Sequence, residues 1–195
     1  MRRKVFDLLA SIGGVAVVLM LLIAGGLATW GYDFADSSVH SQLAQQQIAF
    51  PAKGSAALAD PKIGPYLDQY AGRQLTTGDQ AKAYADHYIA VHLSEMPYGG
   101  VYSQVSSASR ADPKNTALAA EVQTSFQGTT LRGLLLEAYA FSVFATLALW
   151  AAIASFALAL LFAVLVGLGI RHSRQVPADA ELLAHPAVDA ELSTA

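Results

Sequence analysis

The chain has 195 residues, of which 54% are hydrophobic and only 14% are charged, and its net charge of −3 is spread thinly. It contains no cysteine, which excludes disulfide bonds, thiolate metal sites and cysteine nucleophiles. Basic residues cluster only beside the two long apolar runs described below, so the chain lacks the basic patch of a nucleic-acid-binding protein.

The first apolar run covers residues 8–32 and follows a basic start at residues 2–4. A bilayer core about 30 Å thick requires roughly 20 apolar helical residues, so the run predicts a first transmembrane helix. Trp30 and Tyr32 lie at its outer end, where interfacial aromatic residues are expected. The alternative is a signal peptide, with the small residues near 26–28 as its cleavage region.

The segment 33–137 predicts a small, mostly helical domain between two spans. Asp36, Ser37 and Ser38 offer caps for a helix over 39–49, after a short break from the first span. Prolines and glycines then punctuate a loop, and a short apolar turn follows at residues 66–70.

The clearest helix of this segment covers residues 78–96, because Thr77 and Gln80 form a capping-box pattern before it. The only strand candidate covers residues 101–107. A third helix is expected from Asp112 as its cap to Gln127, with Pro113 at its first position and Gly128 as its stop.

The second apolar run covers residues 138–170 and would form a helix about 50 Å long, which exceeds the hydrocarbon core. We expect its membrane part at residues 150–170, with Trp150 at the outer boundary; alternatively, Trp150 is an ordinary packing residue. Residues 131–149 would then continue the helix above the membrane or lie in the interface, and their apolar surface must be covered by the chain's own outer domain or by a partner. The candidate partner-facing residues are Leu134, Leu135, Tyr139, Phe141 and Phe144.

Small residues recur at every fourth position of the second span, which favours close packing of helix backbones. This predicts that the two spans cross as a tight hairpin, although alanine is abundant throughout the chain and could produce the pattern by itself. The predicted stripe consists of Ala151, Ser155, Ala159, Ala163 and Gly167.

Arg171, His172 and Arg174 follow the second run, as residues 2–4 precede the first. Short basic flanks stay in the cytoplasm, so we expect both termini there and residues 33–137 outside the cell membrane. Residues 171–195 predict a disordered cytoplasmic tail, for which a docking peptide is the alternative.

Motifs for catalysis or cofactor binding are weak, so we expect no catalytic, metal or cofactor site. His87 and His92 lie about 140° apart on a helix, whereas zinc helices place ligands at i and i+4; with Glu95 they form the only metal-like group. No serine has the setting of a nucleophile elbow. The span cores carry no ionisable residue, and Met20 is the only candidate haem ligand in them.

The start of the chain through Ser11, the run 74–93 and the two-span layout resemble a family of small actinobacterial membrane proteins. Some members are accessory subunits of the respiratory supercomplex that joins a cytochrome bcc complex to a terminal oxidase. The resemblance covers most of the chain up to about Arg174 and transfers no functional residue. Members are sometimes labelled aromatic ring-opening dioxygenases, and the spacing of His87 and His92 argues against the iron site that this label requires.

The resemblance implies a non-catalytic accessory subunit that stabilises or bridges the core subunits of a respiratory complex. Its expected partners are membrane lipids and an integral-membrane complex, with no nucleic acid and no small-molecule substrate. The alternative is a membrane-anchored sensor or ligand-binding module with a tyrosine-lined pocket. That pocket would be formed by Tyr66, Tyr70, Tyr84, Tyr88, Tyr98 and Tyr102.

Overall fold

The structure is a computed structural model that describes residues 3–175 and residue 177. The chain divides into two compact units. The first unit contains the chain up to Thr29 together with the chain from Leu149 onward, and the second extends from Trp30 to Ala148.

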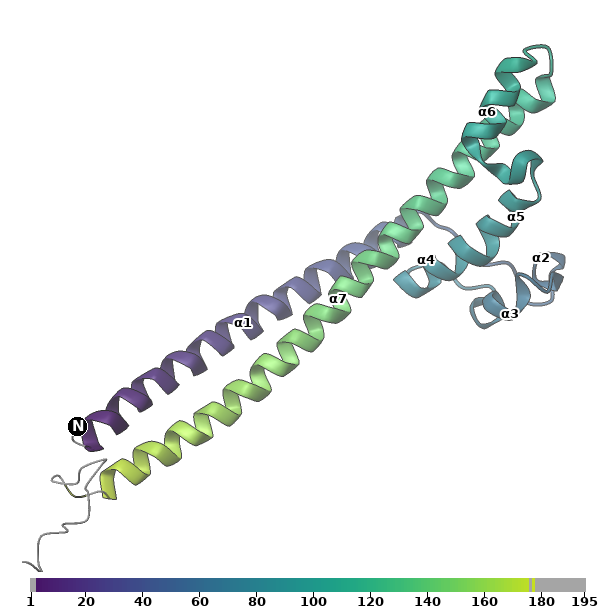
Figure 1. The fold of residues 1–195 in the computed structure, drawn as a ribbon. Helices are drawn as coiled ribbons and strands as arrows, with labels where there is room; N and C mark the ends of the chain where they lie inside the picture. Colours follow the sequence, from purple (N-terminus) through teal and green to yellow (C-terminus); the bar gives the residue numbers. More distant parts are fainter. Residues whose placement is uncertain (1–2, 176, 178–195) are drawn as a thin grey trace, which may run out of the picture. The chain divides into compact units, whose positions relative to one another are not determined.

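Two long helices, α1 (Arg3–Gln45) and α7 (Thr116–Gln175), each contribute residues to both units (Figure 1). Both are long and apolar enough to cross a membrane, and only 6% of the most apolar window of each is buried. The core helix of a soluble protein would be mostly buried. The prediction of a mainly helical chain with two long apolar helices is therefore confirmed.

Short helices of the second unit connect α1 to α7, and no strand occurs among the residues that the structure describes. An isolated antiparallel bridge joins Ala49 to Gln74. The connecting helices are α2 (Ala56–Ala59), α3 (Gly64–Leu67), η1 (Asp68–Tyr70), α4 (Gly78–Tyr84), η2 (Ala85–Ile89), α5 (Ala90–Ser94), η3 (Pro97–Gly100) and α6 (Tyr102–Ala111).

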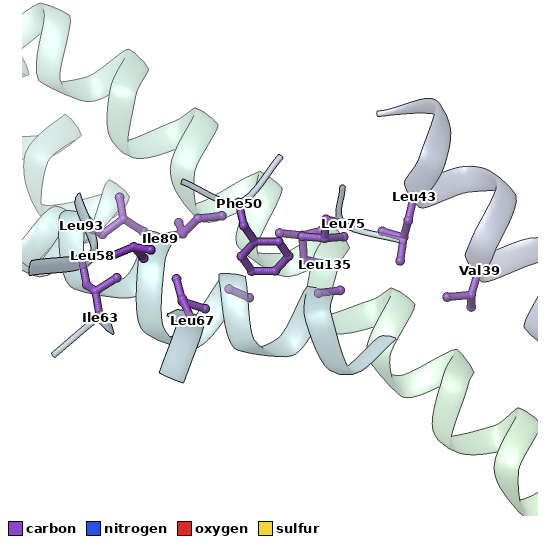
Figure 2. Close-up of a cluster of buried hydrophobic side chains, with 12 residues drawn as sticks. Val39, Leu43, Phe50, Leu58, Ile63, Leu67, Leu75, Ile89, Leu93 and Leu135 are labelled. Atoms are coloured by element: carbon purple, nitrogen blue, oxygen red, sulfur yellow. The ribbon is translucent and has the colours of Figure 1, made fainter. Parts of the chain in front are cut away.

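The core of the second unit draws on both long helices and on the segment between them (Figure 2). Val39 and Leu43 come from α1, and Leu135 comes from α7. Leu67 and Leu75 are completely buried at the centre. Each fully buried side chain of this kind stabilises the fold by about 1.5–3 kcal/mol relative to an exposed one, so this cluster holds the short helices against α7.

The capping box predicted before α4 is confirmed. The Thr77 hydroxyl accepts a hydrogen bond from the Gln80 amide N–H at 3.3 Å, and the Gln80 side-chain oxygen accepts from the Thr77 amide N–H at 3.1 Å. The helix predicted over 78–96 is present as α4, η2 and α5 in succession, and it ends at Ser94. Its middle part, η2, is a π-helical turn that sequence periodicity did not indicate.

The predicted break before residues 39–49 is wrong, because α1 continues without interruption to Gln45. The Ser37 hydroxyl donates to the backbone carbonyl of Phe34 at 3.2 Å inside the helix, and so it does not act as a cap. A serine can bond back to the preceding turn in this way while the helix continues through it.

Two further predictions on the outer segment are corrected. The strand candidate 101–107 lies mostly in α6. The expected third helix and the second span are one helix, α7, which starts after Pro113 with the Asn115 side-chain oxygen accepting from Leu118 N–H at 3.0 Å. Gly128 does not stop this helix; it lies inside it, where Leu93 packs closely on its face.

Residues 171–175 of the predicted C-terminal tail are helical, because α7 extends to Gln175. Residue 176 and residues 178–195 lie outside the described residues, and with them most of the predicted tail and its alternative reading as a docking peptide.

Candidate functional site

The part of α7 in the second unit has a covered side and an exposed side. Leu135 is only 2% exposed and belongs to the core. Leu134, Phe141 and Phe144, which we call the apolar flank, are 59%, 48% and 64% exposed. At about 100° per residue these three positions fall within roughly 80° of one face of the helix.

Tyr139 lies on the covered side with Leu135. Its ring faces the Lys82 ammonium group, with Nζ 5.4 Å from the ring centroid, and its backbone lies against Gly78. The five residues predicted to face a partner therefore divide into two groups. The chain's own domain covers Leu135 and half-buried Tyr139, and it leaves the apolar flank exposed.

Arg132 and Asp86 help to fix which side of α7 is covered. The Arg132 guanidinium donates to the Asp86 carboxylate at 2.9 Å and to the carbonyl oxygen of Ala85 at 3.3 Å. Hydrogen bonds from Lys82 and then Arg132 hold the pKa of Asp86 below its usual value, although partial burial acts in the opposite direction. The hydrogen bond and charge of Asp86 raise the pKa of Lys82.

Gly78 sets the distance of closest approach between α4 and α7. A Cβ atom at this position would lie 1.9 Å from the Ser142 hydroxyl oxygen and 2.4 Å from the Ser142 Cβ. Only a residue without a side chain fits there, so Gly78 brings α4 onto the covered side. The sequence pattern indicates Gly78 only as the start of a helix, and it indicates neither this packing role nor the Arg132–Asp86 pair.

Five of the six tyrosines named for the alternative function make ring contacts with neighbouring side chains. Tyr70 and Tyr84 pack on Phe50 with ring centroids 5.1 Å and 5.5 Å away, and Tyr84 continues to Tyr88 at 4.7 Å. Burial, with a smaller effect of Tyr88, raises the pKa of Tyr84 to about 12. This phenol therefore stays neutral at physiological pH as part of the packed interior.

The other three tyrosines have other ring partners or are exposed. Tyr66 stacks on His87 at 3.6 Å, Tyr102 contacts Phe126 at 5.7 Å, and Tyr98 is 54% exposed in η3.

His87 and His92 take part in separate aromatic contacts. His87 stacks on Tyr66, whereas the His92 ring packs on Tyr88 at 4.5 Å and its Nδ1 lies 2.7 Å from the Tyr88 carbonyl oxygen. Within residues 3–175 and residue 177, no three of the side chains that commonly bind metals come together. His87 is half-buried, whereas His92 is exposed.

The buried face of α7 follows a repeat of seven residues. Ala145, Ala152 and Ala159 are 2%, 3% and 2% exposed. Of the stripe predicted at every fourth position, Ala159 is buried and Ser155 half-buried. The exposed members of that stripe are Ala151, Ala163 and Gly167.

In the first unit, α1 approaches α7 closely at two glycines of α1. Gly25 of α1 is buried against the Phe156 ring, and a Cβ on Gly14 would lie 2.4 Å from a Val166 methyl group. A seven-residue repeat is typical of left-handed helix pairs, whereas close packing at every fourth residue is typical of right-handed ones. The recurrence of alanine at positions 138, 145, 152 and 159 is visible in the sequence and could have indicated this face.

The predicted interfacial aromatic residues are mostly exposed. Trp30 and Trp150 are 67% and 63% exposed, and Tyr32 is half-buried. Trp30 stacks on Phe34 with ring centroids 5.8 Å apart. Large indole rings that find no cover in the chain suit the boundary between lipid and water.

No protein-family model, curated protein or solved structure matches this chain. We therefore infer its function from the residues described above, together with the family resemblance of its sequence.

Proposed function

We propose that this chain is a non-catalytic accessory subunit of a membrane complex, held in the cell membrane by two spans. Both termini lie in the cytoplasm, and residues 33–137 lie outside. Two observations support the membrane placement: the apolar windows of α1 and α7 are almost entirely unburied within the chain, and basic residues flank them on the side of both termini.

The apolar flank is the observation that carries the subunit proposal. Leu134, Phe141 and Phe144 stay exposed although the neighbouring Leu135 is buried in the chain's own core. The uncharged run of α7 is longer than a bilayer core, so this outer part of the helix extends toward water. Covering each of these apolar side chains would contribute about 1.5–3 kcal/mol. A partner protein would provide that cover.

The resemblance of the chain start and of residues 74–93 supports an actinobacterial supercomplex of cytochrome bcc and terminal oxidase as the proposed partner. In this proposal the spans pack beside the core subunits, and the outer helical domain caps or bridges them through the apolar flank. The chain contributes no redox group of its own.

Purification of the tagged full chain from actinobacterial cells in a mild detergent tests this proposal. We expect haem absorbance and cytochrome subunits to purify with the chain, and we expect the double substitution Phe141→Ser and Phe144→Ser to abolish that recovery. Phe126→Ser is the matched control, because Phe126 is also an exposed phenylalanine of α7, 50% exposed, outside the apolar flank. Clean recovery of the unsubstituted chain without haem, from cells rich in supercomplex, would refute the proposal.

A further inference from the structure

A groove of about 750 Å³ lies between the first turns of α1 and the last turns of α7 in the first unit. Its volume lies in the range of about 300–1,000 Å³ that is typical of small-ligand sites. Its walls are Lys4, Leu8, Ser11, Ile12 and Val15 from α1, and Ile170, Ser173 and Arg174 from α7.

The walls change from charged to apolar along the groove. Lys4 is the wall residue nearest the start of the chain and Arg174 is the one nearest its end, so both cations belong to the outermost turns of their helices. Leu8, Ile12 and Val15 continue inward from Lys4 and are 60%, 58% and 45% exposed. From Lys4 to Val15 the helix rises about 16 Å, which suits most of one fatty-acyl chain.

The walls carry two positive groups and no negative one. Asp7, the acid nearest in sequence, does not line the groove; it is half-buried, and one of its carboxylate oxygens has no hydrogen-bond partner among the described residues. A ligand that complements this groove therefore has an anionic head and an apolar tail.

We propose that this groove binds one anionic phospholipid of the cytoplasmic leaflet. Lys4 and Arg174 hold the phosphate, and an acyl chain lies along Leu8, Ile12 and Val15. This inference rests on the proposed membrane placement, in which both helix ends reach the cytoplasmic surface. A phospholipid fits better than a free phosphate ion, because inorganic phosphate gains nothing from the apolar wall.

The test measures lipids retained by the full chain. The chain is purified in detergent, titrated with phosphatidylglycerol or phosphatidylcholine, and examined by native mass spectrometry. We expect preferential binding of one phosphatidylglycerol. The double substitution Lys4→Gln and Arg174→Gln should weaken that binding about 25-fold, since each cation near an anionic membrane surface contributes about a factor of five.

Two matched pairs separate the groove from general surface charge. Arg174→Gln should weaken phosphatidylglycerol binding, whereas Arg171→Gln, the same change at an exposed residue outside the groove, should have little effect. Ile12→Trp should fill the apolar wall and abolish retention without changing charge. Ile23→Trp is its control, because Ile23 is an exposed apolar residue of α1 outside the groove.

Three results would overturn the inference: equal binding of both lipids, equal effects within either matched pair, or full displacement of the lipid by millimolar inorganic phosphate. Alkaline carbonate extraction of cell membranes is run in parallel. A chain released by carbonate would refute the proposed membrane placement itself, whereas a chain that stays in the membrane and shows no lipid preference would refute only the groove assignment.

Discussion

Replacing Gly78 by alanine should loosen the outer helical domain from α7. The added Cβ would lie 2.4 Å from the Ser142 Cβ, so rotation of the Ser142 hydroxyl cannot remove the overlap. The Tyr139 Cα lies 3.3 Å away and restricts movement in that direction as well. The φ angle of Gly78 lies outside the left-handed region, so alanine adopts this backbone without strain and the effect comes from packing alone.

The magnitude follows from two opposing contributions. Overpacking a close contact costs about 1–3 kcal/mol, and replacing glycine by alanine returns up to about 1 kcal/mol by restricting the unfolded chain. We expect a net loss of about 1–2 kcal/mol in the free energy of opening α4 and α5. Hydrogen exchange of the amides in residues 78–94 should then become about 5- to 30-fold faster.

The assay is hydrogen exchange followed by mass spectrometry on the full chain in lipid nanodiscs. Ser142→Gly removes the atoms that collide and should restore at least half of the protection lost in Gly78→Ala, after correction for its own helix cost of about 0.5 kcal/mol. Gly133→Ala is the control, since a Cβ on Gly133 meets nothing within 4 Å. Unchanged exchange in Gly78→Ala, or no recovery with Ser142→Gly, would refute the close-approach role of Gly78.

Two further predictions concern charge and the helix pair. Asp86→Asn should lower the free energy of unfolding at pH 7 by about 0.5–1 kcal/mol. The expected loss is small because Lys82 and Arg132 are more than a third exposed, so solvent screens their attraction to Asp86. Since pairing lowers the folded-state pKa of Asp86, its stabilisation is present above the ordinary carboxyl value of 3.8 and is lost as pH falls through the lowered value. Urea titrations from pH 7 to pH 2 should show the two proteins converging at the acid end, and a constant difference would contradict this. Gly25→Ile should lower the SDS concentration at which the two spans separate, because a Cβ at Gly25 would lie 2.9 Å from the Phe156 ring. Gly26→Ile is the control and should leave that concentration unchanged, because a Cβ at Gly26 meets nothing within 4 Å. Equal shifts in the two variants would argue against close packing of α1 on α7 at Gly25.

Local signals in the sequence were reliable where one short-range interaction decides the structure. The Thr77–Gln80 capping box was predicted and found, because both partners lie within one helical turn. The caps at residues 36–38 and the stop at Gly128 were wrong. Serine and glycine can also occur inside a long helix when tertiary contacts outweigh their local preferences, as Leu93 packing on Gly128 illustrates.

The surface proposed for a partner could be predicted only as a segment. The length of the second apolar run indicated that part of α7 needs a cover, but the run is apolar on all sides. Only the folded domain separates buried Leu135 from exposed Leu134, because Gly78 and the Arg132–Asp86 pair fix which side of the helix the domain covers.

The sequence by itself determined that this chain is helical and carries two apolar helices long enough to cross a bilayer, since apolar length and the absence of charge are local properties. Tertiary structure alone decided which faces pack. The spans approach each other closely at Gly14 and Gly25, and the groove beside Lys4 and Arg174 joins residues from opposite ends of the chain. Such pairings depend on the closest approach of two helices, which is set by the shapes of side chains far apart in sequence.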